Sequence, residues 1–484
     1  MASLPTDIKI DILSRLPVKS LLRFKCMSKS FCSLIASQEF IKIHLKRSIE
    51  TNSNLSLILS GTPAPILDSS RYWNGKIFSA SLDSLNLGVE LDHPFKNCKG
   101  RTPIIDSCNG LIALKNDENG IAFWNPSTKE HLILPKYWGD LKDKVYMVVD
   151  GFGYDAVNDD YKVVRLVHFV RENVEYTEVS VYSLRTNSWR RIRVDFPYYI
   201  LHGWDGKFVD GHVHWLVTNN PEGYIENLII AFNLKSEEFH EVPLPHLGNK
   251  NDVLVMFVGN FSGCLYFSCL CNYPQPVDIW VLKGCWTKAF SFHRSVGDYV
   301  KALAYSKSED KVLVDKFKYG EEDDDINRWE LCWYDPQNQR AADQLTIHGG
   351  IPQGCRDTIV CMDSLVSLAA YAGRGVAGRE GRMSYKRALL IPREINIVLR
   401  RLIMICPYPS LTCCRDTIIC MDSLVSLAAY AGRGVAGREG RMSYKRKRRG
   451  RQRRKNELQE RDKYCLEKTD YDLSLSITNM LPDG

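Results

Sequence analysis

Residues 100–350 carry short runs of β-branched and aromatic residues separated by Gly, Asn, Asp and Pro, and this pattern most limits how the chain can fold. Helical periodicity is nearly absent there, so strands are expected. Polar turns recur at intervals of roughly fifty residues, near Asn125, Ser183, Asn233, Leu282 and Asp335. This spacing predicts an all-β domain built like a β-propeller of the kelch type.

The chain has 484 residues, more than a single domain of about 100 to 150 residues needs. We therefore expect several parts. A small all-α unit of three helices occupies residues 1–47, and residues 48–99 form a connector and the start of the β-domain. The propeller-like domain covers residues 100–368. Residues 369–484 form a duplicated segment and a poorly ordered basic tail.

The composition is that of an ordinary globular chain, with 44% hydrophobic and 25% charged residues. No apolar run approaches the ~18 uncharged residues that a membrane-spanning helix needs. The first residues, MASLPTDIKIDILSRLP, contain acids where a signal peptide would have an apolar stretch. These features predict a soluble intracellular protein, cytoplasmic and/or nuclear, with no membrane partner.

The net charge of +7 is concentrated in residues 445–455, KRKRRGRQRRK, where nine of the eleven residues are Lys or Arg. Without this segment the chain would carry a charge of about −2. The folded body therefore does not look like a nucleic-acid-binding surface. We expect nucleic acid to bind only nonspecifically through the tail, which is also a candidate nuclear-import signal.

The sixteen cysteines are scattered, and no two of them form a C-x-x-C pair. Neither a zinc site nor a disulfide framework is predicted from them. His212 and His214 share one side of a predicted strand, but no third metal ligand is evident, and HVHWL is interpreted as a strand with Trp215 in the core. No metal or cofactor is expected.

A 33-residue stretch at 355–387 returns at 414–446 with one change, Val360 to Ile419. Such close identity is typical of a recent duplication or a gene-model artefact rather than of two independently folded repeats. In the first copy, the residues from Cys361 to Leu368 resemble the strand that usually ends the F-box-associated domain of a large plant protein family. This resemblance implies that the first copy's strand completes the β-domain. The second copy has no vacant place in that domain and should be poorly ordered.

The first 47 residues read as three short helices. Thr6 and Asp7 can cap the first, and Ile8, Ile12 and Leu16 follow one face of it. Pro17 ends this helix, and Ser28 can cap the third. A unit of about forty residues has a marginal core, so apolar residues left on its surface would form an interface.

The segment from Leu4 to Phe40 strongly resembles the F-box of the large plant F-box protein family, on the residues LPTDIKIDILSRLPVKSLLRFKCMSKSFCSLIASQEF. Phe31 departs from the family, which usually carries Trp there. The resemblance implies binding to a Skp-family adaptor and, through it, to the cullin and RING subunits of an SCF ubiquitin ligase. The adaptor contacts that it implies are Leu4, Pro5, Ile8, Ile12, Leu16, Pro17, Val18 and Leu21.

The β-rich region resembles the F-box-associated domain, type 1, of the same family, often described as F-box/kelch-repeat. The resemblance rests on NPSTKE, GFGYDAVNDDYKVV, VYSLRTNSWR, DGHVHWL and DIWVLK, which occur in the family's order. Together with the F-box it covers about Leu4 to Leu368. It implies an interaction domain that holds a target protein.

No catalytic motif stands out. GRGVAG at 373–378 and 432–437 matches G-x-G-x-x-G, but the segment after each copy, REGRMSYKR, is not helix-periodic, so a flexible linker is the better interpretation. The acidic run Glu321 to Asp325 is interpreted as a solvated loop that is also able to attract a basic substrate patch.

The predicted function is therefore that of a non-catalytic substrate receptor that recruits a target for ubiquitination and proteasomal degradation. Loops that carry aromatic residues are the candidate target-binding sites. These residues are Tyr137, Trp138, Tyr198, Tyr199 and Trp204. Two alternatives are an F-box scaffold acting outside the ligase and a propeller-type hydrolase with polar residues in its channel.

Overall fold

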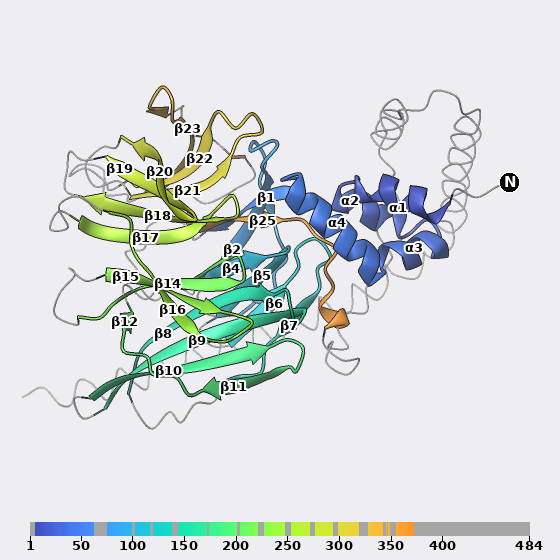
Figure 1. Ribbon diagram of the computed structural model, residues 1–484. Helices are drawn as coiled ribbons and strands as arrows, with labels where there is room; N and C mark the ends of the chain where they lie inside the picture. Colours follow the sequence, from blue (N-terminus) through green and yellow to red (C-terminus); the bar gives the residue numbers. More distant parts are fainter. Residues whose placement is uncertain are drawn as a thin grey trace, which may run out of the picture. The chain divides into compact units, whose positions relative to one another are not determined.

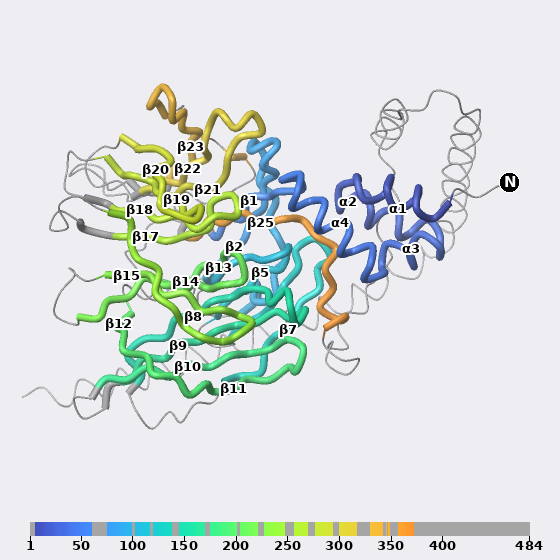
Figure 2. Tube along the Cα trace, viewed as in Figure 1, coloured from blue at the N-terminus to red at the C-terminus, as the bar shows by residue number. Residues whose placement is uncertain are grey.

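The structure is a computed structural model, and among the residues that it describes four α-helices precede six antiparallel sheets (Figures 1 and 2). It describes residues 5–61, 75–98, 102–116, 120–137, 144–171, 174–200, 204–220, 227–246, 253–271, 276–293, 299–318, 328–341, 345, 347–348 and 355–371. The second copy of the duplicated stretch, the basic tail and both GRGVAG strings lie outside these residues. So does the acidic run Glu321 to Asp325.

The helical segment consists of α1 (Thr6–Ser14), α2 (Val18–Phe24), α3 (Lys29–Ile35) and α4 (Gln38–Glu50). Serine side chains cap the last two helices. Ser28 Oγ accepts a hydrogen bond from the Phe31 amide at 3.1 Å, as predicted, and Ser37 Oγ accepts one from the Phe40 amide at 3.2 Å. The fourth helix was not predicted from the sequence.

The six sheets each pair neighbouring antiparallel strands. Sheet 1 contains β1 (Leu55–Gly61), β2 (Lys76–Ser81), β3 (Val89–Glu90) and β25 (Cys355–Met362). Sheet 2 contains β4 (Ile104–Cys108), β5 (Leu111–Asn116), β6 (Gly120–Trp124) and β7 (His131–Ile133). Sheet 3 contains β8 (Lys144–Asp155), β9 (Asp160–Arg171), β10 (Val174–Ser183) and β11 (Ser188–Ile192).

The remaining three sheets have the same plan. Sheet 4 contains β12 (Tyr199–Ile200), β13 (Lys207–Val209), β14 (His212–Thr218), β15 (Asn227–Asn233) and β16 (Phe239–Val242). Sheet 5 contains β17 (Val253–Phe261), β18 (Cys264–Cys271), β19 (Val277–Lys283) and β20 (Cys285–Phe292). Sheet 6 contains β21 (Tyr299–Tyr305), β22 (Val312–Lys318), β23 (Arg328–Asp335) and β24 (Arg340–Ala341).

One edge strand of each sheet faces a common axis. β25, β4, β8, β13, β17 and β21 contact one another in that order, and β21 returns to β25. This closed ring makes the sheets the six blades of a β-propeller. Apolar clusters fill the spaces between neighbouring blades, for example Val149 and Val164 of blade 3 against Val213 and Trp215 of blade 4.

The ring is closed by strands from the two ends of the domain. β25 pairs antiparallel with β1 from Leu55↔Met362 to Ser60↔Asp357, and Figure 2 shows the blue and orange tubes side by side there. The expectation that the first copy of the duplicated stretch completes the sheet is confirmed. A short 3-10 helix, Leu368–Ala370, comes after this strand.

The turns predicted near Asn125, Ser183, Asn233, Leu282 and Asp335 join the two outermost strands of blades 2 to 6. Three of them use the same local chemistry. The side chains of Asn125, Asn233 and Asp335 each accept a hydrogen bond from the amide two residues ahead, at 2.9, 2.8 and 2.9 Å. Such Asx turns explain why the sequence repeats polar residues at these points.

Two glycines permit close contact between blades 3 and 4. The Gly206 amide donates to the Asp150 carbonyl at 2.7 Å, beside a parallel bridge between Gly151 and Gly206. A Cβ on Gly206 would lie 2.4 Å from Cε2 of Trp215, and one on Gly151 would lie 2.3 Å from Cγ1 of Val213. Both positions therefore exclude a side chain.

Gly206→Ala should destabilise the propeller by about 1–3 kcal/mol, because the methyl group must displace the buried Trp215 ring. Chemical denaturation of the full chain measures the loss. Gly75→Ala is the matched control, since its Cβ would lie 3.5 Å from the nearest atom, Cβ of Thr102. Equal free energies of unfolding for the two variants would contradict the packing argument.

Candidate functional site: an apolar helical face and the propeller channel

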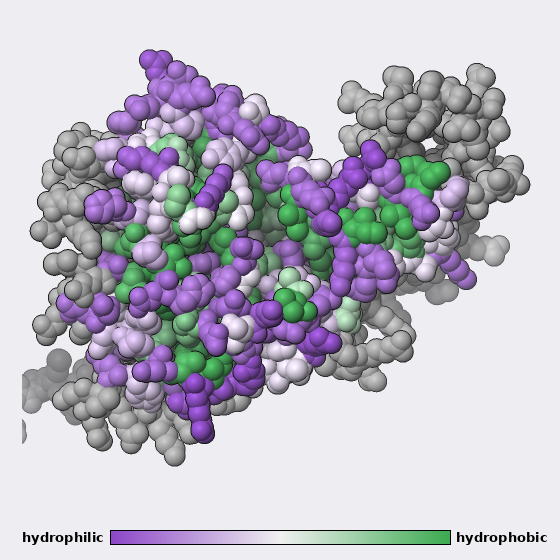
Figure 3. Space-filling model, viewed as in Figure 1, coloured by the Kyte–Doolittle hydropathy of each residue, from purple (hydrophilic) through white to green (hydrophobic). Residues whose placement is uncertain are grey.

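The first candidate surface is the exposed apolar face of α1. Ile8 and Ile12 lie one helical turn apart, and 47% and 37% of their surfaces are exposed. Pro5, Pro17 and Met27 are also exposed. Figure 3 shows hydrophobic surface over this helical segment. Exposed large aliphatic side chains on a small helical unit fit an interface better than a solvated face.

The predicted adaptor contacts divide into two groups in the structure. Pro5, Ile8, Ile12 and Pro17 are exposed, and their contact with an adaptor stays a prediction. Three of the predicted contacts, Leu16, Val18 and Leu21, are instead buried among the helices, with 4%, 1% and 0% of their surfaces exposed. These three side chains pack within the helical segment of the unbound chain, and their contact with an adaptor also stays a prediction. Leu4 lies outside the described residues.

A buried histidine joins the helices. His44 of α4 is 1% exposed, and its Nε2 lies 2.9 Å from the Leu16 carbonyl oxygen between α1 and α2. Since a carbonyl only accepts, Nε2 carries the proton and donates it. Burial lowers the pKa of His44, against the opposite effect of the bond to Leu16. The folded state therefore favours the neutral form of the His44 ring.

The second candidate site is the central channel of the propeller. It holds a cavity of about 640 Å³, within the ~300–1,000 Å³ typical of ligand sites. Side chains from five of the six innermost strands line it, namely β4, β13, β17, β21 and β25. Because these strands belong to five blades, no continuous stretch of sequence could reveal this site.

Trp204 is the predicted target-binding aromatic that lines this cavity. It precedes β13, and 43% of its surface is exposed. Its ring packs edge-on against Phe257 of β17, with 4.4 Å between centroids. Nζ of Lys301, on β21, lies 6.0 Å from the Trp204 centroid. Sequence reasoning did not identify Phe257 and Lys301 as site residues, because the sequence of one strand does not show which residues of other blades lie across the channel from it.

Two carboxylates of the channel wall bind backbone amides of other blades. Asp106 of β4 accepts a hydrogen bond from the Phe208 amide at 2.8 Å, and Asp205 accepts one from the Asp150 amide at 2.8 Å. Burial raises the pKa of Asp106, and it raises the pKa of Asp205 to about 6, against the opposing charge of Lys115. These bonds hold neighbouring blades together.

Three other predicted target-binding aromatics lie outside the channel. Tyr137 packs against Trp189 with 5.5 Å between ring centroids. Tyr198 donates a hydrogen bond to Glu241 at 2.7 Å, and Tyr199 packs edge-on against His168. None of these three lines the channel cavity, and their target contacts stay a prediction. Trp138 lies outside the described residues.

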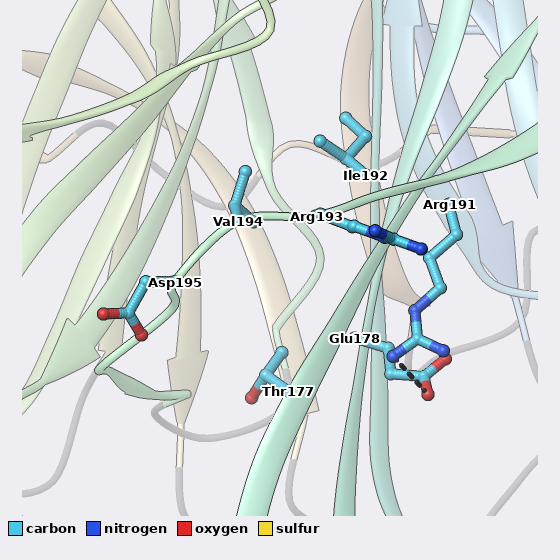
Figure 4. A pocket seen from close by; sticks show the side chains of 7 residues that line it. All are labelled: Thr177, Glu178, Arg191, Ile192, Arg193, Val194 and Asp195. Carbon is cyan, nitrogen blue, oxygen red and sulfur yellow. Dashed lines mark ion pairs between the residues drawn. The ribbon is translucent and has the colours of Figure 1, made fainter.

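A groove of about 930 Å³ lies at the outer strands of blade 3 (Figure 4). It is lined by β11 and the residues after it, up to Asp195, together with Thr177 and Glu178 of β10. Arg191 and Glu178 form an ion pair across it, at 2.9 Å. Its lining comes from the two outer strands of blade 3 and the chain that follows them, whereas strands of five blades line the channel.

A third histidine lies near the pair considered in the sequence. His240 of β16 packs edge-on against His212, with 5.1 Å between ring centroids, and His214 lies 6.1 Å from His212. Burial lowers the pKa of His214 to about 4. Among the described residues, no group of three His, Cys, Asp or Glu side chains has the geometry of a metal site.

Comparison with known proteins matches both parts of the chain. The F-box domain family matches residues 1–43, and the family described as F-box associated beta propeller domain matches residues 75–312. The chain therefore belongs to the F-box proteins that carry an F-box associated β-propeller. Among the described helices, none has the length and apolarity needed to span a bilayer.

Three relatives from Arabidopsis thaliana show the extent of the similarity. F-box protein CPR1 is 35% identical over 372 residues, which cover 70% of this chain and 84% of the relative. F-box protein At4g22390 is 30% identical, with 70% and 85% covered. F-box/kelch-repeat protein At3g23880 is 29% identical, with 75% and 96% covered.

Acidification should loosen the helical segment through His44. The unfolded chain binds a proton below pH 6.5, whereas the buried ring resists protonation, so stability falls as the pH drops through 6.5. The loss cannot exceed about 1.4 kcal/mol per pH unit. Hydrogen exchange of the α1–α4 amides in the full chain, between pH 7.5 and 5.5, measures it.

His44→Gln is the control for this effect, because its amide can still donate to the Leu16 carbonyl but does not titrate. After correction for intrinsic exchange rates, its helical amides should show a smaller pH dependence than those of the unaltered chain. The same dependence in both proteins would show that another group is responsible.

Proposed function

We propose that this chain is the substrate-recognition subunit of an SCF-type ubiquitin ligase, recruiting a target protein for ubiquitination and proteasomal degradation. Its partners would be a Skp-family adaptor bound to the helical segment, the cullin and RING subunits reached through that adaptor, and a target held by the propeller. Family membership supports the adaptor contact, since the F-box domain matches residues 1–43.

The observation that carries the proposal is the separation of two surfaces in one chain. Ile8 and Ile12 form an exposed apolar face on α1. The channel cavity has a second exposed apolar element at Trp204, on blade 4 of the propeller. A receptor needs two such surfaces, one for the ligase and one for the target.

Such a receptor needs no acid, base or nucleophile of its own. Holding the target beside the ubiquitin-charged enzyme replaces encounters in dilute solution by encounters at a high effective concentration. The buried carboxylates Asp106 and Asp205 fit this role, because their oxygens hold backbone amides of neighbouring blades. We therefore propose a non-catalytic function.

The double substitution Ile8→Asp with Ile12→Asp should reduce the recovery of the adaptor at least tenfold. Each buried aliphatic side chain contributes about 1.5–3 kcal/mol to an interface, and tenfold corresponds to about 1.4 kcal/mol. The measurement is affinity purification of the tagged full chain from plant cells under proteasome inhibition, with mass spectrometry. The charged side chains replace exposed ones, so the helices should still fold.

Ile133→Asp is the matched control, since Ile133 lies on the outer strand β7 and 49% of its surface is exposed. It should recover adaptor and cullin like the unaltered chain. Recovery of adaptor without cullin would indicate a scaffold acting outside the ligase. Equal adaptor recovery from all three proteins would refute the proposed docking face.

A further inference from the structure

We propose that the channel end marked by Trp204 binds an arginine or lysine side chain of the target protein. This inference rests on the proposed function, because only a substrate receptor needs its propeller to recognise a target protein. It assigns the chemistry of that recognition to three residues of different blades, Trp204, Lys301 and Asp357, all of which line the same cavity.

The cavity has two distinguishable ends. Trp204 precedes β13, and Lys301 and Asp357 lie near the starts of β21 and β25. The turns after the innermost strands, at Asn109–Gly110 and Ser262–Gly263, line the other end, together with Asn52 of the link to the helical segment. The Trp204 end therefore lies away from the link to the F-box.

The aromatic wall at this end is suited to a flat cation. Trp204 is braced edge-on by Phe257 at 4.4 Å, which fixes its orientation while 43% of its surface stays exposed. An arginine guanidinium or a lysine ammonium over an indole face gains about 0.5–2 kcal/mol. Lys301, at 6.0 Å from the ring centroid, shows that a cation is tolerated beside this indole.

Most charges around the cavity already have partners. Lys207 donates to the Ile105 carbonyl at 2.9 Å, beside Asp106. Asp205 faces Lys115 at 3.6 Å. Lys301 lies opposite Asp315 in the β21–β22 register, and its charge acts on that buried carboxyl. These groups therefore leave little net charge for a ligand.

Asp357 is the exception. It is half-buried, it lines the cavity, and its carboxylate has no hydrogen bond or ion pair with another described residue. Asp315 lies close enough for the two carboxylates to repel each other. With Asp315 and Asp357 against Lys301, this end of the cavity favours a positive ligand. A guanidinium could bind Asp357 through paired hydrogen bonds.

The test uses four pools of acetylated, amidated octapeptides on the immobilised full chain. The central residue is Arg, Lys, citrulline or Glu, and the other positions are random among Gly, Ala and Ser. Retained peptides are quantified by mass spectrometry. The Arg pool should be retained at least tenfold more than its neutral isostere citrulline, and Trp204→Ala or Asp357→Asn should each abolish this preference.

Two controls assign the effect to the channel. Tyr146→Ala removes an aromatic that is 68% exposed on β8, and Asp195→Asn alters the outer groove of blade 3. Both should keep the preference for Arg. Equal retention of the Arg and citrulline pools, an unchanged preference in Trp204→Ala and Asp357→Asn, or a preference for Glu would each overturn the proposal.

Recovery of the adaptor distinguishes a failure of this inference from a failure of the proposed function. Trp204→Ala and Asp357→Asn should recover the Skp-family adaptor as the unaltered chain does. Chemical denaturation should give both variants the cooperative unfolding of the unaltered chain, which shows that their propellers fold. Loss of the Arg preference with intact adaptor binding supports both proposals. Arg-selective binding by a chain that recovers no adaptor would leave the channel site standing and refute the ligase role.

Discussion

The pairing of β25 with β1 closes the propeller, and the rest of the domain depends on it. The strands come from opposite ends of the domain and align six successive residues, from Leu55↔Met362 to Ser60↔Asp357. The chain after β25 then binds the adjacent blade, where Nδ2 of Asn125 donates to the Val366 carbonyl at 2.8 Å. Without this closure the innermost position of blade 1 would be empty, the edge of β1 would be unpaired, and the cavity would lose one wall, including Asp357.

Buried ion pairs connect neighbouring blades. They define the relative positions of the blades more narrowly than apolar packing alone would. Asp150 binds Arg165 at 2.7 Å and Lys115 at 2.9 Å, and its side chain is fully buried. Burial acts to raise its pKa, but the two cations outweigh that effect and lower it. Such a group adds little stability over an apolar one, yet removing one partner is costly, so the network favours a single arrangement.

The sequence predicted the features that depend on local chemistry. The turns near Asn125, Asn233 and Asp335 and the cap at Ser28 are visible in short stretches of sequence. The closing strand was expected from its resemblance to a known family, and the structure confirms it. Helix α4 was missed, although Ser37 can cap it. Burial of Leu16, Val18 and Leu21 was missed because periodicity does not show which face of a short helix is covered. The assembly of Trp204, Phe257 and Lys301 depends on ring closure, which no local pattern contains.

The order in which the chain is made gives this closure a further consequence. The helical segment ends at Glu50, whereas the strand that completes blade 1 ends at Met362. During synthesis from the N-terminus, α1–α4 leave the ribosome long before β25 exists. An adaptor could therefore bind a nascent chain that cannot yet hold a target, while the unpaired edge of β1 awaits its partner. The chain would then be able to bind an adaptor before it is able to bind a target.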